Sequence, residues 1–230
     1  MTNAGRQAGD VATLKRLMQD RFTCRAFQPD PVPADTIRDI VEMAGCSASW
    51  CNIQPWGVIV TSGAETDAFR ATLMRAAADD SAIAPEIAFP ERYEGVFQQR
   101  RRETGYALYA SLGIERQDYP RRRAQAHENF RLFGAPHVAI ITGEAAIGPY
   151  GLVDCGGFVA SFLLAARAHG VDTAPQASLA EYSGLIRTHF DIDPARQIIC
   201  GISFGYADPD HAANGFRTSR AEVDEIAQFR

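Results

Sequence analysis

SWCNIQPW, residues 49–56, places two tryptophans, a cysteine, an asparagine and a proline within eight positions. Proline fixes the backbone φ angle, and a large indole ring anchors a turn in an apolar core. We therefore interpret Pro55 and Trp56 as structural residues. The loop leads directly into GVIVTSG, residues 57–63, a β-branched run that predicts the first strand. The stretch thus predicts a rigid loop fixed by the strand that follows it.

Helical and strand patterns alternate on both sides of this loop. Apolar residues recur at helical spacing in several segments, and short β-branched runs predict strands between them. The predicted helices span residues 10–20, 33–45, 65–80, 151–169 and about 179–190, and the predicted strands span residues 57–63, 136–143 and 196–205. This alternation predicts an α/β (or α+β) fold in a single domain, residues 1–230, with residues 1–9 as a loose N-terminal tail.

Length and charge narrow the classes of function. A chain of 230 residues can bury a substantial core and suits one large domain. The formal net charge of −5 argues against a nucleic-acid surface and provides no polybasic membrane anchor. The long apolar segment 151–169 carries Asp154, Arg167 and His169, so we interpret it as a buried core helix rather than a membrane span.

The spacing of the cysteines bears on whether the protein is located in a reducing or an oxidising compartment. All five are scattered and none has CxxC spacing, which favours neither a disulfide framework nor a metal site. Because the first ten residues also lack an apolar signal core, a reducing cytoplasm is the predicted location. Cys51 lies in the quoted loop, but no histidine is paired with it in the sequence, which disfavours a nucleophilic thiol.

Residues 81–123 differ from the rest of the chain. They contain three prolines, a run of aromatic residues and two arginine clusters, at 100–102 and 121–123. About forty residues cannot easily form an independent core, so we predict an insertion that covers a site. The arginines predict either a solvated helical face or a contact with an anionic substrate.

Most catalytic signatures are absent from the sequence. There is no GxGxxG after a strand, no GxxxxGK[ST], no GxSxG and no HExxH, which disfavours a Rossmann dehydrogenase, a kinase, a serine hydrolase and a zinc hydrolase. Arginines occur instead near both ends, in RFTCRAF (21–27) and NGFRTSR (214–220). Guanidinium groups from such distant segments can converge on a phosphate, because their planar donors match its oxygens. Surface arginines that only aid solubility are the alternative.

Five segments, taken in order, resemble the FMN-dependent nitroreductase family. They are RFTCRAF (21–27), SASWCNIQPW (47–56), ENFRLFGAPH (128–137), PQAS (175–178) and NGFRTSR (214–220). The first is similar to the family motif RxSxR and the second to PSxxNxQPW. The resemblance spans roughly residues 14–225, and the sequences of the motifs are most similar to the nitrobenzoate-reductase-like branch.

The resemblance implies a fold and an assembly. The nitroreductase-like fold is a mixed four- or five-stranded sheet surrounded by helices, in an intertwined homodimer with FMN at the subunit interface. Gly157 and Ser161 lie four residues apart on the predicted helix 151–169. Such small residues allow another helix to approach closely, so we expect this face at the dimer interface. A helix packed only within its own chain is the alternative.

The resemblance also implies the residues that bind FMN. The phosphate and ribityl chain would contact the N- and C-terminal motifs, the neighbouring subunit would supply the SWCNIQPW loop, and the turn at PQAS would follow the ring edge, with a backbone N–H near Ala177 donating to N5. Arg131 would lie at the N1 and O2 edge and tune the flavin; a surface arginine is the alternative. The implied contacts are Arg21, Phe22, Thr23, Arg25, Ser49, Asn52, Asn129, Arg131, Gln176, Ala177, Ser178, Arg217, Thr218 and Arg220.

Five positions depart from the family pattern. Ala48 replaces the usual proline, and Trp50 and Cys51 replace smaller residues. Thr23 replaces a serine, and Thr218 stands where many members have lysine. Thr23 keeps the hydroxyl group, whereas the change at Thr218 makes phosphate binding depend more on Arg21 and Arg220.

The implied activity is the reduction of small nitroaromatic compounds to hydroxylamines. NADPH or NADH would deliver a hydride to FMN, and the acceptor would then occupy the same stacked position, in a ping-pong sequence of two-electron steps. The flavin carries the chemistry, so no catalytic protein nucleophile and no metal are expected. The alternatives are a reductase of quinones or another small acceptor, and a flavin-binding protein without catalysis.

Overall fold

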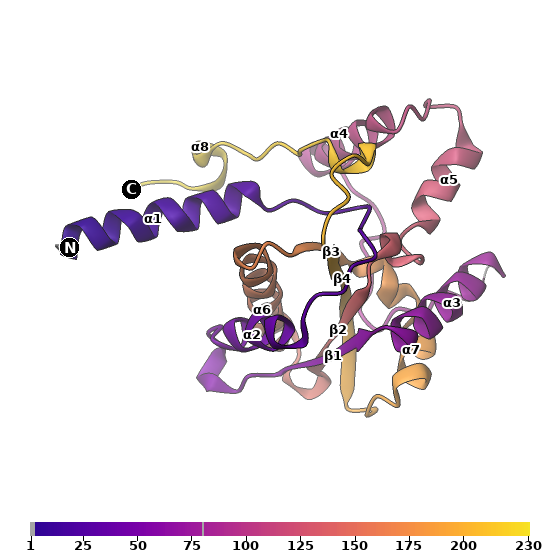
Figure 1. Ribbon diagram of the computed structural model, residues 1–230, viewed down its shortest axis with the longest axis horizontal. Helices are drawn as coiled ribbons and strands as arrows, with labels where there is room; N and C mark the ends of the chain where they lie inside the picture. The colour runs from indigo at the N-terminus through magenta and orange to yellow at the C-terminus, as the bar shows by residue number, and fades with distance from the viewer. Residues whose placement is uncertain (1–2, 80) are drawn as a thin grey trace.

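A four-stranded sheet forms the centre of the molecule (Figure 1). The computed structural model describes residues 3–79 and 81–230. The strands lie in the order β1-β2-β4-β3, and each neighbouring pair runs antiparallel. A parallel bridge joins Thr23 to Thr173 beside β3. The strands are β1 (Trp56–Ser62), β2 (His137–Glu144), β3 (Asp172–Gln176) and β4 (Arg196–Gly205).

Alternation along β2 explains why helices cover both faces of the sheet. Val138 and Ile140 point into one apolar cluster, whereas Ala139 and Ile141 point into another. Successive side chains of a strand point to opposite faces, and these four are all buried. A strand that is apolar on both faces requires a cover on each. The predicted strands 57–63, 136–143 and 196–205 are therefore present, with boundaries within one residue.

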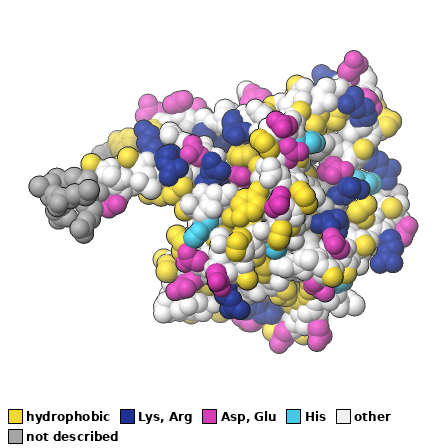
Figure 2. All heavy atoms as spheres, viewed as in Figure 1, with side chains coloured by type: hydrophobic (Ala, Val, Ile, Leu, Met, Phe, Trp, Pro, Cys, Tyr) yellow, Lys and Arg dark blue, Asp and Glu magenta, His cyan; other side chains and the backbone are white. Residues whose placement is uncertain are grey.

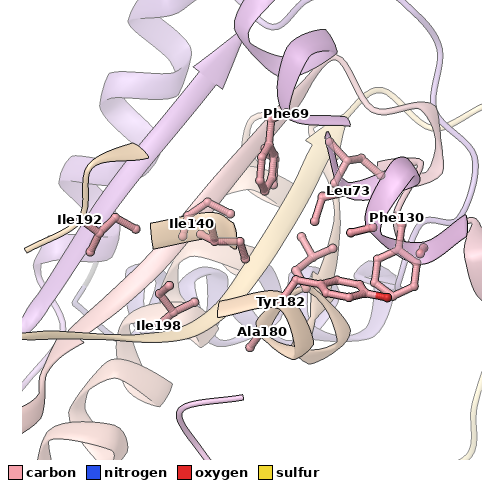
Figure 3. Packing of buried hydrophobic residues seen from close by; sticks show 14 residues of the cluster. Phe69, Leu73, Phe130, Ile140, Ala180, Tyr182, Ile192 and Ile198 are labelled. Atoms are coloured by element: carbon pink, nitrogen blue, oxygen red, sulfur yellow. The ribbon is translucent and has the colours of Figure 1, made fainter. Parts of the chain in front are cut away.

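The first face is covered by α3 (Ala64–Ala78) and α7 (Ser183–Phe190). Phe69 and Leu73 of α3 pack with Ile140 and Ile198 of the sheet and with Ile186 of α7, and Figure 3 shows part of this cluster. Each of these side chains is fully buried. Since each contributes about 1.5–3 kcal/mol on burial, this cluster fixes α3 and α7 against the sheet.

The second face is covered by α2 (Ala34–Gly45) and α6 (Pro149–Ala168). Ile40 of α2, Phe158 and Phe162 of α6, and Phe204 of β4 belong to one buried cluster. The Trp56 ring stacks on Phe158 with 5.3 Å between centroids, as expected for the structural residue at the end of the quoted loop. The molecule is thus a three-layer arrangement of helices, sheet and helices (Figure 1).

Helix α6 is buried on one side only. By length and composition it could cross a membrane, yet Asp154, Phe158 and Phe162 lie in the protein interior. The opposite side exposes Val153 and several small residues, including Gly157. The prediction that this segment is a core helix is therefore confirmed, and the side that carries Gly157 is exposed in the single chain.

The predicted loose tail is wrong wherever the structure describes it. Helix α1 spans Asn3–Asp20, so the helix expected at residues 10–20 begins seven residues earlier. Residues 1, 2 and 80 lie outside the described part of the chain. The added residues include Gly5 and Gly9, which have poor helix propensity, so neither local propensity nor an apolar pattern predicts this extension. Figures 1 and 2 show α1 projecting from the body.

The segment 81–123 contains the helix α4 (Gly95–Ser111) and the start of α5 (Tyr119–His127). Its beginning is fixed by Glu86, which forms an ion pair with Arg187 and accepts a 2.7 Å hydrogen bond from the Ile198 backbone N–H. These contacts attach the segment to α7 and β4. The remaining short helices are α8 (Val223–Ile226) and 3₁₀ turns at Trp50–Asn52, Leu132–Gly134, Ala145–Ile147, Ala177–Tyr182 and Ala212–Asn214.

Several arginines of the two clusters bind other parts of the protein. Arg100 forms a 2.8 Å ion pair with Glu225, and Arg101 lies 5.2 Å above the Tyr93 ring. Arg121 donates hydrogen bonds to two backbone carbonyls at the C-terminal end of α4. Cations are favourable at that end of a helix. These three arginines therefore have structural contacts, and a contact with an anionic substrate is not needed to explain them.

Candidate active site

Asn214 joins the two arginine-containing motifs. It is buried, and its Oδ1 accepts a 2.8 Å hydrogen bond from the Arg25 backbone N–H while its Nδ2 donates to the Ala26 carbonyl at 2.8 Å. On the other side, the Cys24 N–H donates to the Thr173 carbonyl at 2.9 Å. The RFTCRAF segment is therefore fixed between β3 and the C-terminal segment. The sequence analysis did not single out Asn214, although it is the first residue of NGFRTSR.

A cavity of about 560 Å³, here called the arginine cavity, lies where these segments meet. Its wall includes four arginines and three threonine hydroxyls, and no acidic residue belongs to it. The sequence-predicted residues that line it are Arg21, Phe22, Thr23, Arg25, Arg217, Thr218 and Arg220. The structure thus brings all the expected phosphate contacts of both motifs to one place.

The arginine cavity concentrates the positive charge of four guanidinium groups. Burial lowers the pKa of Arg21, and the neighbouring Arg220 guanidinium lowers it further. Burial also lowers the pKa of Arg25. Among the described residues, none of the four arginines has a carboxylate within ion-pair distance. A concentration of positive charge with planar hydrogen-bond donors suits a phosphate dianion.

A second cavity, of about 240 Å³, adjoins the first and is here called the amide cavity. Thr23 and Arg25 belong to the walls of both cavities. Three amide side chains line it, Gln125, Asn129 and Gln176, and its apolar wall includes Tyr109. The sequence analysis missed the other lining residues, although it noted the aromatic run containing Tyr109; they are Leu108, Gln125, Ala126, Phe133 and Pro175.

Hydrogen bonds connect the polar residues of the amide cavity. Gln176 Nε2 donates to the Asn129 carbonyl at 2.8 Å, and Ser178 Oγ donates to Asn129 Oδ1 at 3.1 Å. Pro175 and Gln176 are the last residues of β3, so the expected turn begins only at Ala177. As the first residue of a 3₁₀ helix, Ala177 has a backbone N–H without an acceptor inside that helix.

Arg131 lies apart from these groups. It forms a 3.4 Å ion pair with Glu128 and lines a third cavity of about 550 Å³, together with Leu112 and His211. The two residues that follow it, Leu132 and Phe133, have left-handed φ values of 57° and 53°. Arg131 is not among the residues that line the amide cavity, although the third cavity shares Arg25 and Phe133 with it. The structure therefore does not bring Arg131 to Asn129 and Gln176 as the resemblance implied.

The SWCNIQPW loop has an unusual backbone. Cys51, Asn52 and Gln54 have φ values of 48°, 57° and 46°, a left-handed conformation that is uncommon outside glycine. Asp154 of α6 supports the loop, because its two carboxylate oxygens lie 3.1 and 3.2 Å from the Trp50 backbone nitrogen. Cys51 is exposed, and all five cysteines are free thiols.

Ser49 and Asn52 of this loop do not reach either cavity in the same chain. Neither residue lines the arginine cavity or the amide cavity. The Ser49 Oγ accepts a 3.0 Å hydrogen bond from the Gln54 N–H, and Asn52 Oδ1 lies 3.2 Å from Gln54 Nε2. In Figure 1 the connection between α2 and β1 lies across the molecule from α4. Within one chain the structure therefore separates these two residues from the other expected contacts.

Comparisons with known proteins agree with this architecture. The model of the nitroreductase family matches residues 18–206. The nitroreductase NfnB of Mycolicibacterium smegmatis is 39% identical over 222 residues, which cover 94% of this chain and 92% of that protein. The 4-nitrobenzoate reductase of Pseudomonas putida is 30% identical over 213 residues, which cover 93% of each protein.

A solved structure gives the same result. The crystal structure of the FMN-dependent nitroreductase NfnB from Mycobacterium smegmatis, in complex with NADPH, matches with a TM-score of 0.91 at 37% identity, and the match covers 96% of this chain and 99% of that one. Sequence and fold agree over nearly the whole chain, including both motifs that line the arginine cavity. The chain therefore belongs to the nitroreductase family, in the branch that contains the nitrobenzoate reductases.

Proposed function

We propose that this protein is an FMN-dependent NAD(P)H oxidoreductase that reduces nitroaromatic compounds to hydroxylamines. The observation that carries the proposal is the pair of adjoining cavities, one lined by four arginines and the other by amides and apolar side chains. An elongated ligand with a dianion at one end and a planar polar ring at the other fits this pair. The FMN-dependent relatives support the same assignment.

The residues of the two cavities suit the parts of FMN in order. Arg21, Arg217 and Arg220 would bind the phosphate, Thr23 and Arg25 would contact the ribityl chain between the cavities, and the ring would lie beside Asn129. Ala177 lines neither cavity, but it is exposed next to Gln176, where its backbone N–H would reach the ring edge. The walls also include Phe22 and Thr218 in the arginine cavity and Gln176 in the amide cavity. Ser178 lines neither cavity but hydrogen-bonds to Asn129. When bound, FMN supplies the transfer of two electrons between NAD(P)H and the acceptor. The protein supplies binding, orientation and exclusion of water.

A single chain gives an incomplete site. The amide cavity of about 240 Å³ is smaller than the roughly 300–1,000 Å³ that ordinary ligand pockets occupy. We infer that a second copy completes it in a homodimer, with Ser49 and Asn52 contributed across the interface. Two apolar surfaces support this assembly: the exposed side of α6, and the stripe Val11, Leu14 and Met18 on α1, whose exposures are 63%, 52% and 58%. A monomer would leave both in water.

The segment 81–123 is proposed to cover this site. Leu108 and Tyr109 of α4 line the amide cavity, and Thr104 lines the arginine cavity. Helix α5 adds Gln125 and Ala126. A cover limits access of water to the ring and leaves room for a planar acceptor against it.

The proposed acceptor is a small nitroaromatic, with nitrobenzoates as candidates because two relatives are named 4-nitrobenzoate reductase. NADPH or NADH is the proposed donor; the NfnB structure contains NADPH. Donor and acceptor would use one position in turn, in a ping-pong sequence. The five free thiols suit a reducing cytoplasm.

Anaerobic reduction tests the proposal. The purified protein, reconstituted with FMN, is mixed with NADPH or with NADH, and bleaching of the flavin absorbance is followed before nitroarenes, nitrobenzoates and quinones are added. The expected result is bleaching, reoxidation by nitroarenes with hydroxylamine as product, and parallel lines in steady-state plots. Faster reoxidation by quinones than by every nitroarene would instead assign a quinone reductase, and binding without bleaching would assign a non-catalytic flavin protein.

A further inference from the structure

Two backbone carbonyls fix the orientation of two side-chain amides in the amide cavity. Gln176 faces the Asn129 carbonyl at 2.8 Å, and Asn129 Nδ2 faces the Ala126 carbonyl at 3.0 Å. A carbonyl oxygen only accepts hydrogen bonds, so the nitrogen of each amide must point toward it. Each carbonyl therefore favours one of the two orientations of its amide.

Serine hydroxyls donate hydrogen bonds to the oxygen atoms of the same two amides. Ser203 Oγ donates to Gln176 Oε1 at 2.5 Å, and Ser178 Oγ donates to Asn129 Oδ1 at 3.1 Å. Gln176 Nε2 also lies 3.3 Å from Asn129 Oδ1. Ser203 has no exposed surface and Gln176 is only 3% exposed, so rotation of Gln176 would leave buried polar atoms without partners.

One hydrogen-bond donor is left over at the end of this chain of contacts. Asn129 Oδ1 already accepts from two donors, and one Nδ2 hydrogen binds Ala126. The second Nδ2 hydrogen has no acceptor among the described residues, and Asn129 lines the amide cavity. The side chain thus presents an N–H, and not a carbonyl, to a ligand.

We infer that Ser203 and Ser178 are positioning residues that fix the Asn129 amide with its N–H toward the cavity, so that this point of the site binds a carbonyl oxygen of the ligand. The inference rests on the proposed function for the identity of that ligand, the FMN ring. Ser203 acts through Gln176, and Ser178 acts on Asn129 directly. A ring N–H could not bind at this point, so the network also determines which edge of the ring faces Asn129.

A double-mutant cycle tests the inference through the FMN dissociation constant. Ser203→Ala is expected to weaken FMN binding about tenfold, because Gln176 and then Asn129 can rotate. In an Asn129→Ala background the same substitution should change binding less than about twofold. Ser178→Ala, at a half-buried position, provides a second variant with the same expected coupling. Additive effects in both cycles would overturn the inference.

Ser183→Ala is the matched control. Ser183 is as fully buried as Ser203 and donates a 2.7 Å hydrogen bond to the Ala180 carbonyl, but it does not contact the network. Its loss should lower stability without coupling to Asn129. In infrared difference spectra, Ser203→Ala and Asn129→Ala should each shift a carbonyl band of bound FMN to higher wavenumber, whereas Ser183→Ala should not.

A readout without FMN separates this inference from the proposed function. In the ligand-free protein, the two side-chain amide protons of Asn129 should give one NMR signal for the hydrogen bonded to Ala126 and one that exchanges faster. Ser203→Ala should broaden or double both signals. If wild-type protein binds no FMN, the proposed function fails; if the amide signals of the wild type and Ser203→Ala are identical, the positioning role fails.

Discussion

The four guanidinium groups of the arginine cavity favour binding of the FMN phosphate but lower the stability of the ligand-free protein. Burial and the proximity of Arg220 both lower the pKa of Arg21, which means that the folded protein disfavours the charge it carries. Residues that bind an anion often destabilise the empty protein in this way. Arg21 and Arg220 therefore have opposite expected effects on the ligand-free and the FMN-bound protein.

Replacing Arg21 or Arg220 should change FMN affinity and the stability of the ligand-free protein in opposite directions. Arg21→Ala and Arg220→Ala are each expected to weaken FMN binding by about 1.5–3 kcal/mol, because each removes charge-assisted donors from the phosphate. The ligand-free variants should melt at the same temperature as the wild type or higher, because repulsion is relieved. FMN titration and thermal melts with and without FMN measure both effects.

Arg75→Ala serves as the control, since Arg75 is an exposed residue on α3, outside the walls of both cavities. FMN affinity that is unchanged in both cavity variants would refute the assignment of the arginine cavity to the phosphate.

His137 is a buried residue with a different kind of electrostatic constraint. Its Nε2 accepts a 2.9 Å hydrogen bond from the Val32 backbone N–H, and its Nδ1 lies 3.1 Å from the Thr61 carbonyl. The Nδ1 therefore carries the proton of a neutral ring. Burial lowers the pKa of His137, and the contact with the Thr61 carbonyl opposes this only in part.

The lowered pKa predicts a loss of stability in acid. Above about pH 6.5 the ring is neutral in both the folded and the unfolded protein, and its contribution is fully present. As the pH falls below that value, the unfolded chain takes up a proton that folded His137 resists, so the free energy of unfolding decreases. Urea unfolding between pH 5 and 8 measures this slope. His137→Gln should flatten it, whereas His127→Gln, outside the core, should not.

The SWCNIQPW loop depends on α6 for its shape. Three left-handed residues in four positions cost roughly 1 kcal/mol or more each, and the surrounding structure must compensate. Asp154 provides an acceptor for the Trp50 N–H at the start of the 3₁₀ turn, where a negative charge is favourable. Just before the loop, the Ser47 hydroxyl donates a 2.7 Å hydrogen bond to Ser161 Oγ of α6. The helix thus stabilises a loop that its own sequence does not favour.

Removing the Asp154 carboxylate should therefore release the loop. Asp154→Ala is expected to cost about 1–3 kcal/mol and to increase hydrogen exchange at the amides of residues 50–54. Asp154→Asn keeps one oxygen acceptor, so its effect should be intermediate. Exchange rates in this loop that are equal in all three proteins would show that Asp154 does not support it.

Some elements could be predicted from the sequence because burial leaves a periodic pattern. The β-branched runs 136–143 and 196–205 mark strands with apolar neighbours on both faces. Helices α4 and α5 have no buried residue, so no apolar periodicity revealed them within residues 81–123. The helical start of α1 was missed for the same reason, since a helix without an apolar face differs little from a loose tail in its pattern.

The residues of the candidate site likewise fall into those that the sequence could predict and those that it could not. The spacing of motifs predicted which segments meet, and Arg21 and Arg220 do line one cavity. Spacing does not encode the direction of a side chain, so the placement of Arg131 at the ring edge stays a prediction; in the structure Arg131 lines the third cavity. Ser203 was not singled out because a buried serine in a strand leaves no distinctive pattern; its role depends on a contact with Gln176, 27 residues away.

At the level of the whole molecule, Ser49 and Asn52 lie apart from the arginine cavity of their own chain. A complete site that uses all of these residues therefore requires two chains. If each site uses Arg21 from one chain and Asn52 from the other, neither half is sufficient alone. The wild type should then be a homodimer at all concentrations at which it binds FMN. Sedimentation with and without FMN measures this, and a fully active monomer would contradict it.

Co-expression of two defective chains gives the sharper test. Arg21→Ala removes a phosphate contact, and Asn52→Gly removes the side chain while tolerating the left-handed φ of 57° at that position. Random pairing makes half of the dimers mixed, and each mixed dimer holds one intact site of two, so the mixture should recover about a quarter of the wild-type sites for FMN binding and turnover. Arg21→Ala mixed with Arg220→Ala should recover none, because both substitutions fall in the same half of the site. Equal recovery in the two mixtures would show that the site is not shared between chains.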